Sequence, residues 1–183
     1  MIAYLRGRHV DTQPRTGIVM KRLLLWCAAL GALGCAAAGT GARSTGTTAV
    51  SAADRDAVVA AVQSLFDAMR ARDTAAIKTA FAPNAQLVSI RSTPGAPPRV
   101  NVLSVPAFAA SIGRATDALV ERMWDPRVEV AGDIASLWAP YDFRRGSTFS
   151  HCGHDAAHLV RTAEGWKIAA ITYTVTTAGC ITP

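Results

Sequence analysis

The residues whose spacing first indicates chemistry are His154 and His158, which flank an acid in the segment HDAAH. The segment is close to the H-E-x-x-H motif, in which two histidines bind zinc and the acid acts as a general base. That motif has to be helical, because only a helix brings residues i and i+4 onto one face about 6 Å apart. On a strand, at about 3.3 Å per residue, the two histidines lie about 13 Å apart. One zinc ion cannot bridge that distance.

The surrounding sequence indicates a strand and supplies no third metal ligand. Residues 148–162 are followed by WKIAAITYTV, which is rich in β-branched residues, so the two segments form a predicted hairpin. Glu164 falls in the turn between them, and no Asp or Glu follows it. We therefore predict no metal site.

The alternation along this hairpin predicts which side chains share a face. If Glu164-Gly165 forms a two-residue turn, Ala157 lies opposite Thr172 and Asp155 lies opposite Thr174. Their common face also carries the large apolar side chain of Trp166, so we take it as the interior.

Extending the pairing through the preceding turn signal, Arg145-Gly146, adds a third strand. Gly153 then lies opposite Trp138 and His151 opposite Pro140, and Asp142 reaches the same face. Small residues on this face leave room for a ligand that the polar groups could orient.

These positions give candidate roles. Asp155 is the predicted general base with a raised pKa, and His151 is its predicted proton partner. Trp138, Asp142 and Thr172 are the predicted ligand-binding residues on the same face. The alternative is structural: Asp155 orders the strand through hydrogen bonds, and His151 is a partly exposed strand histidine.

Two tyrosines fall on the opposite face in this pairing. Tyr141 and Tyr173 share it with His154 and His158, which we expect to point outward. The tyrosines could equally serve a ligand or a dimer interface, and Tyr141 is kept among the ligand-binding candidates. No cofactor is expected, because the sequence has no glycine-rich phosphate loop, no cysteine–histidine zinc spacing and no nucleophile elbow.

Helices precede the strands that carry these residues. Ser51-x-x-Asp54 is a capping box, followed by one apolar stripe of Val58, Val62, Leu65, Phe66 and Met69. Asp73 caps a short second helix through Phe81, a strand follows at 85–90, and residues 92–99 form an exposed loop. Ser104 caps a third helix. Strands are expected at 119–131, 134–144, 148–162 and 166–177.

This order of elements predicts an α+β domain. Helices come first and a meander of antiparallel strands follows, so the sheet is expected to curl around the N-terminal helices and enclose an apolar cavity.

The N-terminal segment predicts export. Residues 20–35 have two basic residues, a short apolar run and then small residues, as secretory signals do. We then predict that residues 1–19 are an upstream mis-start. A lipoprotein box would make Cys35 the acylated N-terminus and give a periplasmic, membrane-anchored lipoprotein. Cleavage after Ala38 would instead release the protein. Residues 36–53 form a flexible tether, and 54–183 form the domain.

Charge and cysteine content agree with this division. The chain has 19 Lys and Arg against 13 Asp and Glu, but residues 1–35 hold five of the bases and one of the acids. The rest carries 14 against 12, or +2, so the basic balance gives no indication of nucleic-acid binding. In an exported domain Cys152 and Cys180 are predicted to form a disulfide; the alternative is two unrelated buried thiols.

Several stretches together resemble a known family. WAPYDF (138–143), SHCGHDA (150–156), GWKIAAITYT (165–174) and the terminal GC resemble the nuclear transport factor 2-like, or polyketide-cyclase-like, superfamily, in particular its secreted bacterial branch labelled putative lumazine-binding. The resemblance implies a cone-shaped, cystatin-like α+β fold, usually a homodimer, with a pocket between the sheet and the long helix.

The resemblance does not fix the function, because superfamily members include enzymes and non-catalytic binders. Our first hypothesis is an exported domain that binds a small, partly apolar molecule. The alternatives are a cofactor-free isomerase, cyclase or dehydratase using Asp155 and His151, and a dimeric interaction domain with a vestigial pocket. Steroid-isomerase relatives need a tyrosine on the first helix, where this chain has Phe66 and Met69. That departure counts against ketosteroid isomerisation.

Overall fold

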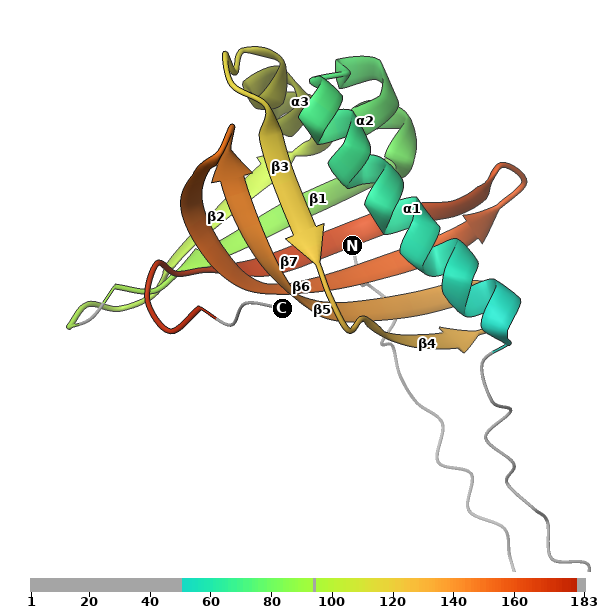
Figure 1. Ribbon diagram of the computed structural model, residues 1–183. Coiled ribbons are helices and arrows are strands. Elements are labelled where there is room, and N and C mark those ends of the chain that lie inside the picture. Colours follow the sequence, from blue (N-terminus) through green and yellow to red (C-terminus); the bar gives the residue numbers. More distant parts are fainter. Residues whose placement is uncertain (1–50, 94, 181–183) are drawn as a thin grey trace, which may run out of the picture. The chain divides into compact units, whose positions relative to one another are not determined.

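The computed structural model describes residues 51–93 and 95–180 (Figure 1). The elements in order are α1 (Ala52–Ala71), α2 (Thr74–Ala80), β1 (Phe81–Arg91), β2 (Arg99–Ser104), α3 (Val105–Gly113), β3 (Leu119–Met123), β4 (Arg127–Ala131), β5 (Ile134–Arg145), β6 (Thr148–Thr162) and β7 (Gly165–Val175).

The predicted helix starts are confirmed. Ser51 caps α1 by accepting a hydrogen bond from the backbone N–H of Asp54, and Asp73 caps α2 in the same manner. Ser104 caps α3, with Pro106 in its first turn. The whole apolar stripe of α1 is buried, since Val58, Val62, Leu65, Phe66 and Met69 are each at most 4% exposed.

The predicted elements at the start of the sheet need two corrections. The second helix ends at Ala80, and Phe81 already begins β1, which extends well beyond the predicted 85–90. The chain after the loop forms a strand, β2, that we did not predict. Val100 and Val102 on this edge strand are 64% and 54% exposed. The strand therefore lacks the buried face that gives the central strands a recognisable sequence pattern.

The sheet runs in the order β2-β1-β7-β6-β5-β3, with β4 also paired to β5. The predicted α+β class and curved sheet are confirmed, and Figure 1 shows α1 lying across the concave side. One feature was not predicted: β1 and β7 are parallel neighbours in an otherwise antiparallel sheet.

The predicted strand 119–131 is in fact two strands. β3 and β4 both pair with β5, and the chain bends between them at Asp125, which has a φ of 46°, and Pro126. Proline has no N–H for the ladder, so pairing stops at this point. The bend turns β3 toward the helices (Figure 1), and Glu121 of β3 lines the cavity on the concave face.

The core lies between the helices and the concave face of the sheet. Val58, Leu65, Ile77, Leu137 and Ile168 are each at most 1% exposed. Within the ranges that the structure describes, no helix is long and apolar enough to cross a membrane. The predicted signal, the tether up to residue 50 and Cys35 lie outside those ranges.

Candidate functional site

The position of the β6–β7 turn differs from the prediction. Thr162 pairs with Gly165, so the turn residues are Ala163 and Glu164. Leu159 consequently lies opposite Ile168. This shift of two residues leaves the facing of β6 unchanged: Asp155 and Leu159 are buried on the concave side as predicted.

A β-bulge in β7 then reverses the facing of its second half. Leu159 pairs with Ile168 but His158 pairs with Ala170, so Ala169 is an extra residue. Ile171 and Tyr173 therefore line the concave face. The prediction that Thr172 faces the interior is wrong, because an odd number of inserted residues moves every later side chain to the other face.

A second bulge, at Ser150 in β6, changes the facing of β5 in the same way. Phe143 pairs with His151, whereas Arg144 pairs with Phe149. As a result Tyr141 and Phe143 reach the concave face, and the predictions for Trp138 and Asp142 are wrong. Trp138 is 48% exposed on the outer side of the sheet.

The concave face encloses a cavity of about 120 Å³. Its walls are mainly apolar and come from α1, α3 and the sheet: Leu65, Phe66, Met69, Phe108, Leu87 and Ile171. Five polar or titratable side chains also line it: Glu121, Tyr141, His151, Asp155 and Tyr173. The cavity thus contains three sequence-predicted site residues, Tyr141, His151 and Asp155.

The most unusual feature of the cavity is a pair of carboxyl groups. Asp155 on β6 is 4% exposed, and Glu121 reaches it from β3. The Asp155 Oδ2 atom has no hydrogen-bond donor among the described residues when both groups are ionised. A proton on either carboxyl group would let it donate a hydrogen bond to the other, and the pair would then consist of one acid and one carboxylate.

The pair has pKa values raised by burial. Burial raises the pKa of Asp155 to about 7, and the hydrogen bond with Glu121 partly opposes the rise. Burial, followed by the charge of Asp155, raises the pKa of Glu121 well above its ordinary value. We therefore expect the pair to hold at least one proton at neutral pH.

His151 lines the cavity. It was predicted to be the proton partner of Asp155, but its contacts are with other residues. Its ring stacks on Phe143 with centroids 4.8 Å apart, and its Nδ1 lies 3.0 Å from the Ser150 hydroxyl. Burial, then the charges of Arg91 and Arg145, lowers the pKa of His151 to about 4. A histidine that is neutral at physiological pH, four strand residues from Asp155, does not suit the predicted role of proton partner.

Two tyrosines place hydroxyl groups near the carboxyl pair. Tyr141 is 1% exposed and donates a hydrogen bond of 2.8 Å to the carbonyl oxygen of Thr174. The Tyr141 ring lies opposite Gly153, where a Cβ would meet the Thr174 carbonyl oxygen at 2.0 Å. Burial raises the pKa of both Tyr141 and Tyr173, so both phenols stay protonated and can donate.

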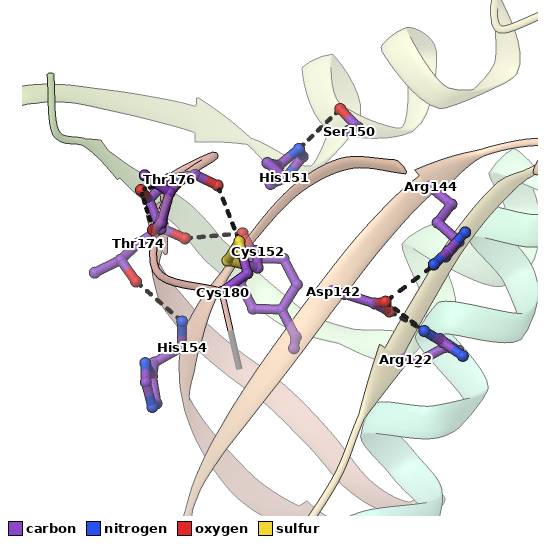
Figure 2. Close-up of a disulfide and its surroundings, with 12 residues drawn as sticks. Arg122, Asp142, Arg144, Ser150, His151, Cys152, His154, Thr174, Thr176 and Cys180 are labelled. Carbon is purple, nitrogen blue, oxygen red and sulfur yellow. Dashed lines mark hydrogen bonds and ion pairs between the residues drawn. A yellow bond between two sulfur atoms is a disulfide. The ribbon is translucent and has the colours of Figure 1, made fainter. Parts of the chain in front are cut away.

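Asp142 serves a different purpose from the predicted one. It is 2% exposed but lies between two arginines, as Figure 2 shows. Arg122 donates from Nε at 2.8 Å and through a second nitrogen, and the Nε of Arg144 lies 3.7 Å from the carboxylate. The hydrogen bond from Arg122 holds the pKa of Asp142 below its ordinary value. Asp142 is thus an ion-paired residue of the sheet.

The segment HDAAH lies on strand β6, as expected. His154 stacks on Trp138 on the outer side with ring centroids 5.3 Å apart, and His158 is exposed. Among the described residues, no group of three or more His, Cys, Asp or Glu side chains is arranged to hold a metal ion.

The disulfide between Cys152 and Cys180 is present (Figure 2). Two backbone hydrogen bonds of 2.9 Å between Cys152 and Thr176 lie beside it. The disulfide fits an exported domain, because disulfides persist in oxidising compartments.

Glu121 was not among the predicted site residues, and Tyr173 was predicted on the wrong face of the sheet. A signal for Glu121 was present: Leu119, Glu121 and Met123 alternate on one face of the strand, which puts a carboxyl group between two apolar side chains. For Tyr173 the sequence carries no such signal, because its facing depends on the bulge at Ala169.

Comparison with known proteins gives a family match and several similar folds. A family described as "Putative lumazine-binding" matches residues 53–174. No curated protein matches the chain. A "putative dehydratase from the NTF2-like family" of Streptomyces avermitilis has 17% identity and a TM-score of 0.51, covering 69% of this chain and 98% of that one.

Two further solved structures have the same fold. An NTF2-like protein with a cystatin-like fold from Novosphingobium aromaticivorans has 17% identity and a TM-score of 0.55, covering 69% of this chain and 84% of its own. An NTF2-like superfamily protein of Salmonella enterica has 12% identity and a TM-score of 0.55, with coverages of 70% and 95%. At these identities the likeness concerns the fold alone.

Proposed function

The chain belongs to the "Putative lumazine-binding" family of the nuclear transport factor 2-like superfamily, and on that premise we propose that its cavity binds one small, partly apolar molecule. The observation that carries the proposal is the apolar cavity with a carboxyl pair on its wall, in which Asp155 is buried and Glu121 is half-buried. A ligand that buries a ring against the apolar wall and offers a polar group to Asp155 and Glu121 satisfies both features.

The size of the cavity limits what it encloses. A dry cavity of about 150 Å³ holds one benzene molecule, and this cavity measures about 120 Å³. One ring therefore fills it, and larger substituents extend to its mouth. The lumazine in the family's description is a fused two-ring heterocycle, so a ligand of that type would bury one ring and leave the rest near the opening.

We predict that indole binds to the wild-type protein with a Kd on the order of 0.1–1 mM, as expected for nine heavy atoms. Leu87 is 3% exposed and lines the cavity, so Leu87→Trp fills the space and weakens indole binding at least tenfold. Saturation-transfer NMR and calorimetric titration measure both effects.

The matched control is Val88→Trp. Val88 is the next residue of β1 and lies on the other face, opposite Thr172. We expect this variant to bind indole within twofold of wild type. Equal loss in both variants, or no binding by the wild type, contradicts the proposal.

A second function, proton-transfer catalysis, is favoured by the carboxyl pair itself. A carboxylate with a pKa near the working pH is a suitable general base, and a protonated acid beside it can donate a hydrogen bond to a developing oxyanion. In this scheme Asp155 accepts a proton from carbon next to a carbonyl group. Once Asp155 has taken this proton it no longer accepts from Glu121, so Glu121 and the Tyr173 hydroxyl can donate hydrogen bonds to the carbonyl oxygen as it gains charge.

This second function predicts exchange of α-protons. We expect the protein to accelerate deuterium incorporation into cyclohexanone in D₂O, with a rate that rises as pH increases through about 7. Asp155→Asn removes the base and lowers the rate at least tenfold, measured by loss of the α-proton NMR signal. A rate equal to that of buffer excludes exchange on this ketone and leaves binding as the function.

A further inference from the structure

Three exposed arginines stand at strand ends: Arg91 ends β1, Arg99 begins β2 and Arg145 ends β5, and we call them the arginine rim. On β1 the side chains of Leu87, Ser89 and Arg91 alternate onto one face, and Leu87 lines the cavity. The register between β1 and β2 is continuous from residue 86 to 91, so no bulge interrupts this alternation. Arg91 therefore continues the row that begins in the cavity.

The other two arginines occupy equivalent positions. Arg99 pairs directly with Arg91 across the β1–β2 ladder, which puts both side chains on the same face. Arg145 follows Tyr141 and Phe143 on β5, both of which line the cavity, and pairs with the buried Leu119. On one face of the sheet the rim thus includes residues near one edge, on β1 and β2, and a residue near the other edge, on β5.

The rim is an unbalanced positive patch. Like charges directly opposite one another in an antiparallel pair are destabilising, and Arg91 and Arg99 are such a pair. Within residues 51–93 and 95–180, none of the three guanidinium groups has a carboxylate within ion-pair distance. By contrast, Arg122 and Arg144 each have one such carboxylate and Arg161 has two.

The rim is close enough to act on the cavity. The charges of Arg91 and Arg145 both disfavour protonation of His151, and Arg91 also favours the ionised forms of Tyr141 and Tyr173. All three of these residues line the cavity. The rim therefore borders the same cavity wall that carries the carboxyl pair: Arg91 lies two residues beyond Ser89, the partner of Tyr173, and Arg145 lies two residues beyond Phe143, the partner of Glu121.

We propose that the arginine rim binds an oxyanion substituent, a carboxylate or a phosphate, of a ligand whose ring lies in the cavity. The inference rests on the proposed binding function and adds the charge of the ligand and its orientation. Guanidinium groups bind either oxyanion through paired N–H donors. The Asp155–Glu121 pair repels an anion, so the charged end of the ligand lies at the rim and its neutral end at the carboxyl pair.

The test compares ligands of equal shape and different charge. We expect 3-phenylpropionate to bind at least tenfold more tightly than 3-phenylpropanamide at 20 mM ionic strength, by calorimetric titration. The preference falls in 0.5 M NaCl, because the rim arginines are exposed and salt screens them. Phenyl phosphate provides the second arm, and its affinity relative to the acid shows which oxyanion the rim prefers.

The double variant Arg91→Gln/Arg99→Gln tests the location. It is expected to reduce the preference for the acid to threefold or less, to leave amide binding unchanged and to raise the melting temperature slightly by removing the like-charge pair. The charge-matched control is Arg70→Gln/Arg127→Gln, which removes two exposed arginines of α1 and β4. Arg145→Gln provides an independent single variant with a smaller effect of the same sign.

The outcomes separate the two proposals. If neither the acid nor the amide binds, both the binding function and the rim inference are overturned. If both bind equally, binding stands and the inference is overturned. If the acid preference persists in Arg91→Gln/Arg99→Gln, or disappears equally in the control, the rim is not the anion site.

Discussion

Asparagine in place of Asp155 is expected to raise the free energy of unfolding at pH 8 by on the order of 3 kcal/mol, with almost no effect at pH 4. The pKa of Asp155 in the folded protein is about 7, against an ordinary value of 3.8. Between these values the folded protein holds a proton that the unfolded chain has lost. The free energy of unfolding therefore falls as pH rises through this window, and the variant has no such loss at this position.

Urea denaturation at several pH values measures the effect. The matched control is Asp142→Asn, for which the sign is reversed. The hydrogen bond from Arg122 lowers the pKa of Asp142, so ionised Asp142 stabilises the fold above its ordinary pKa. Asp142→Asn is thus less stable than wild type at pH 8, and the difference shrinks below about pH 4. If Asp155→Asn instead parallels wild type at every pH, Asp155 titrates as an ordinary surface carboxyl.

Removal of the disulfide has the second large expected effect. Cys152 and Cys180 are 28 residues apart in sequence, and closing a loop of that length stabilises the folded state by about 3–4 kcal/mol relative to the open chain. We expect Cys152→Ala/Cys180→Ala to lose about that free energy of unfolding. Urea denaturation with and without dithiothreitol measures it.

The reductant supplies the internal control for this prediction. Wild-type protein in dithiothreitol should match the double variant, and the double variant should not respond to dithiothreitol at all. A loss below about 1 kcal/mol in both measurements contradicts the loop-closure estimate. Because Cys152 lies next to His151 on β6, indole affinity of the reduced protein reports whether the bridge also maintains the cavity wall.

The fold could be predicted from local signals in the sequence. The caps Ser51 and Asp73 and the apolar stripe of α1 are short-range features, and each was found where it was expected. The two long hairpins follow from β-branched runs separated by turn residues, so their existence was also accessible. The pairing of β1 could not be predicted, because a parallel partner 84 residues further along the chain, as in Gln86 and Ala170, leaves no local pattern.

The site was only partly predictable, and the reason is the same at each wrong residue. Trp138, Asp142 and Thr172 were placed in the interior by counting in steps of two from a turn. The extra residues Ser150 and Ala169 each shift that count by one, which exchanges the two faces of the strand beyond. Asp155 was placed correctly because it lies on the strand from which the counting began.

The parallel pairing of β1 with β7 also affects how the domain folds during synthesis. β1 consists of residues 81–91 and its neighbour of residues 165–175, so the two meet only after nearly the whole domain has been synthesised. Until then the hairpin of β1 and β2 has an open edge that other chains can join. Contacts this distant in sequence slow folding. A chaperone that keeps the nascent chain from aggregating would act during that interval.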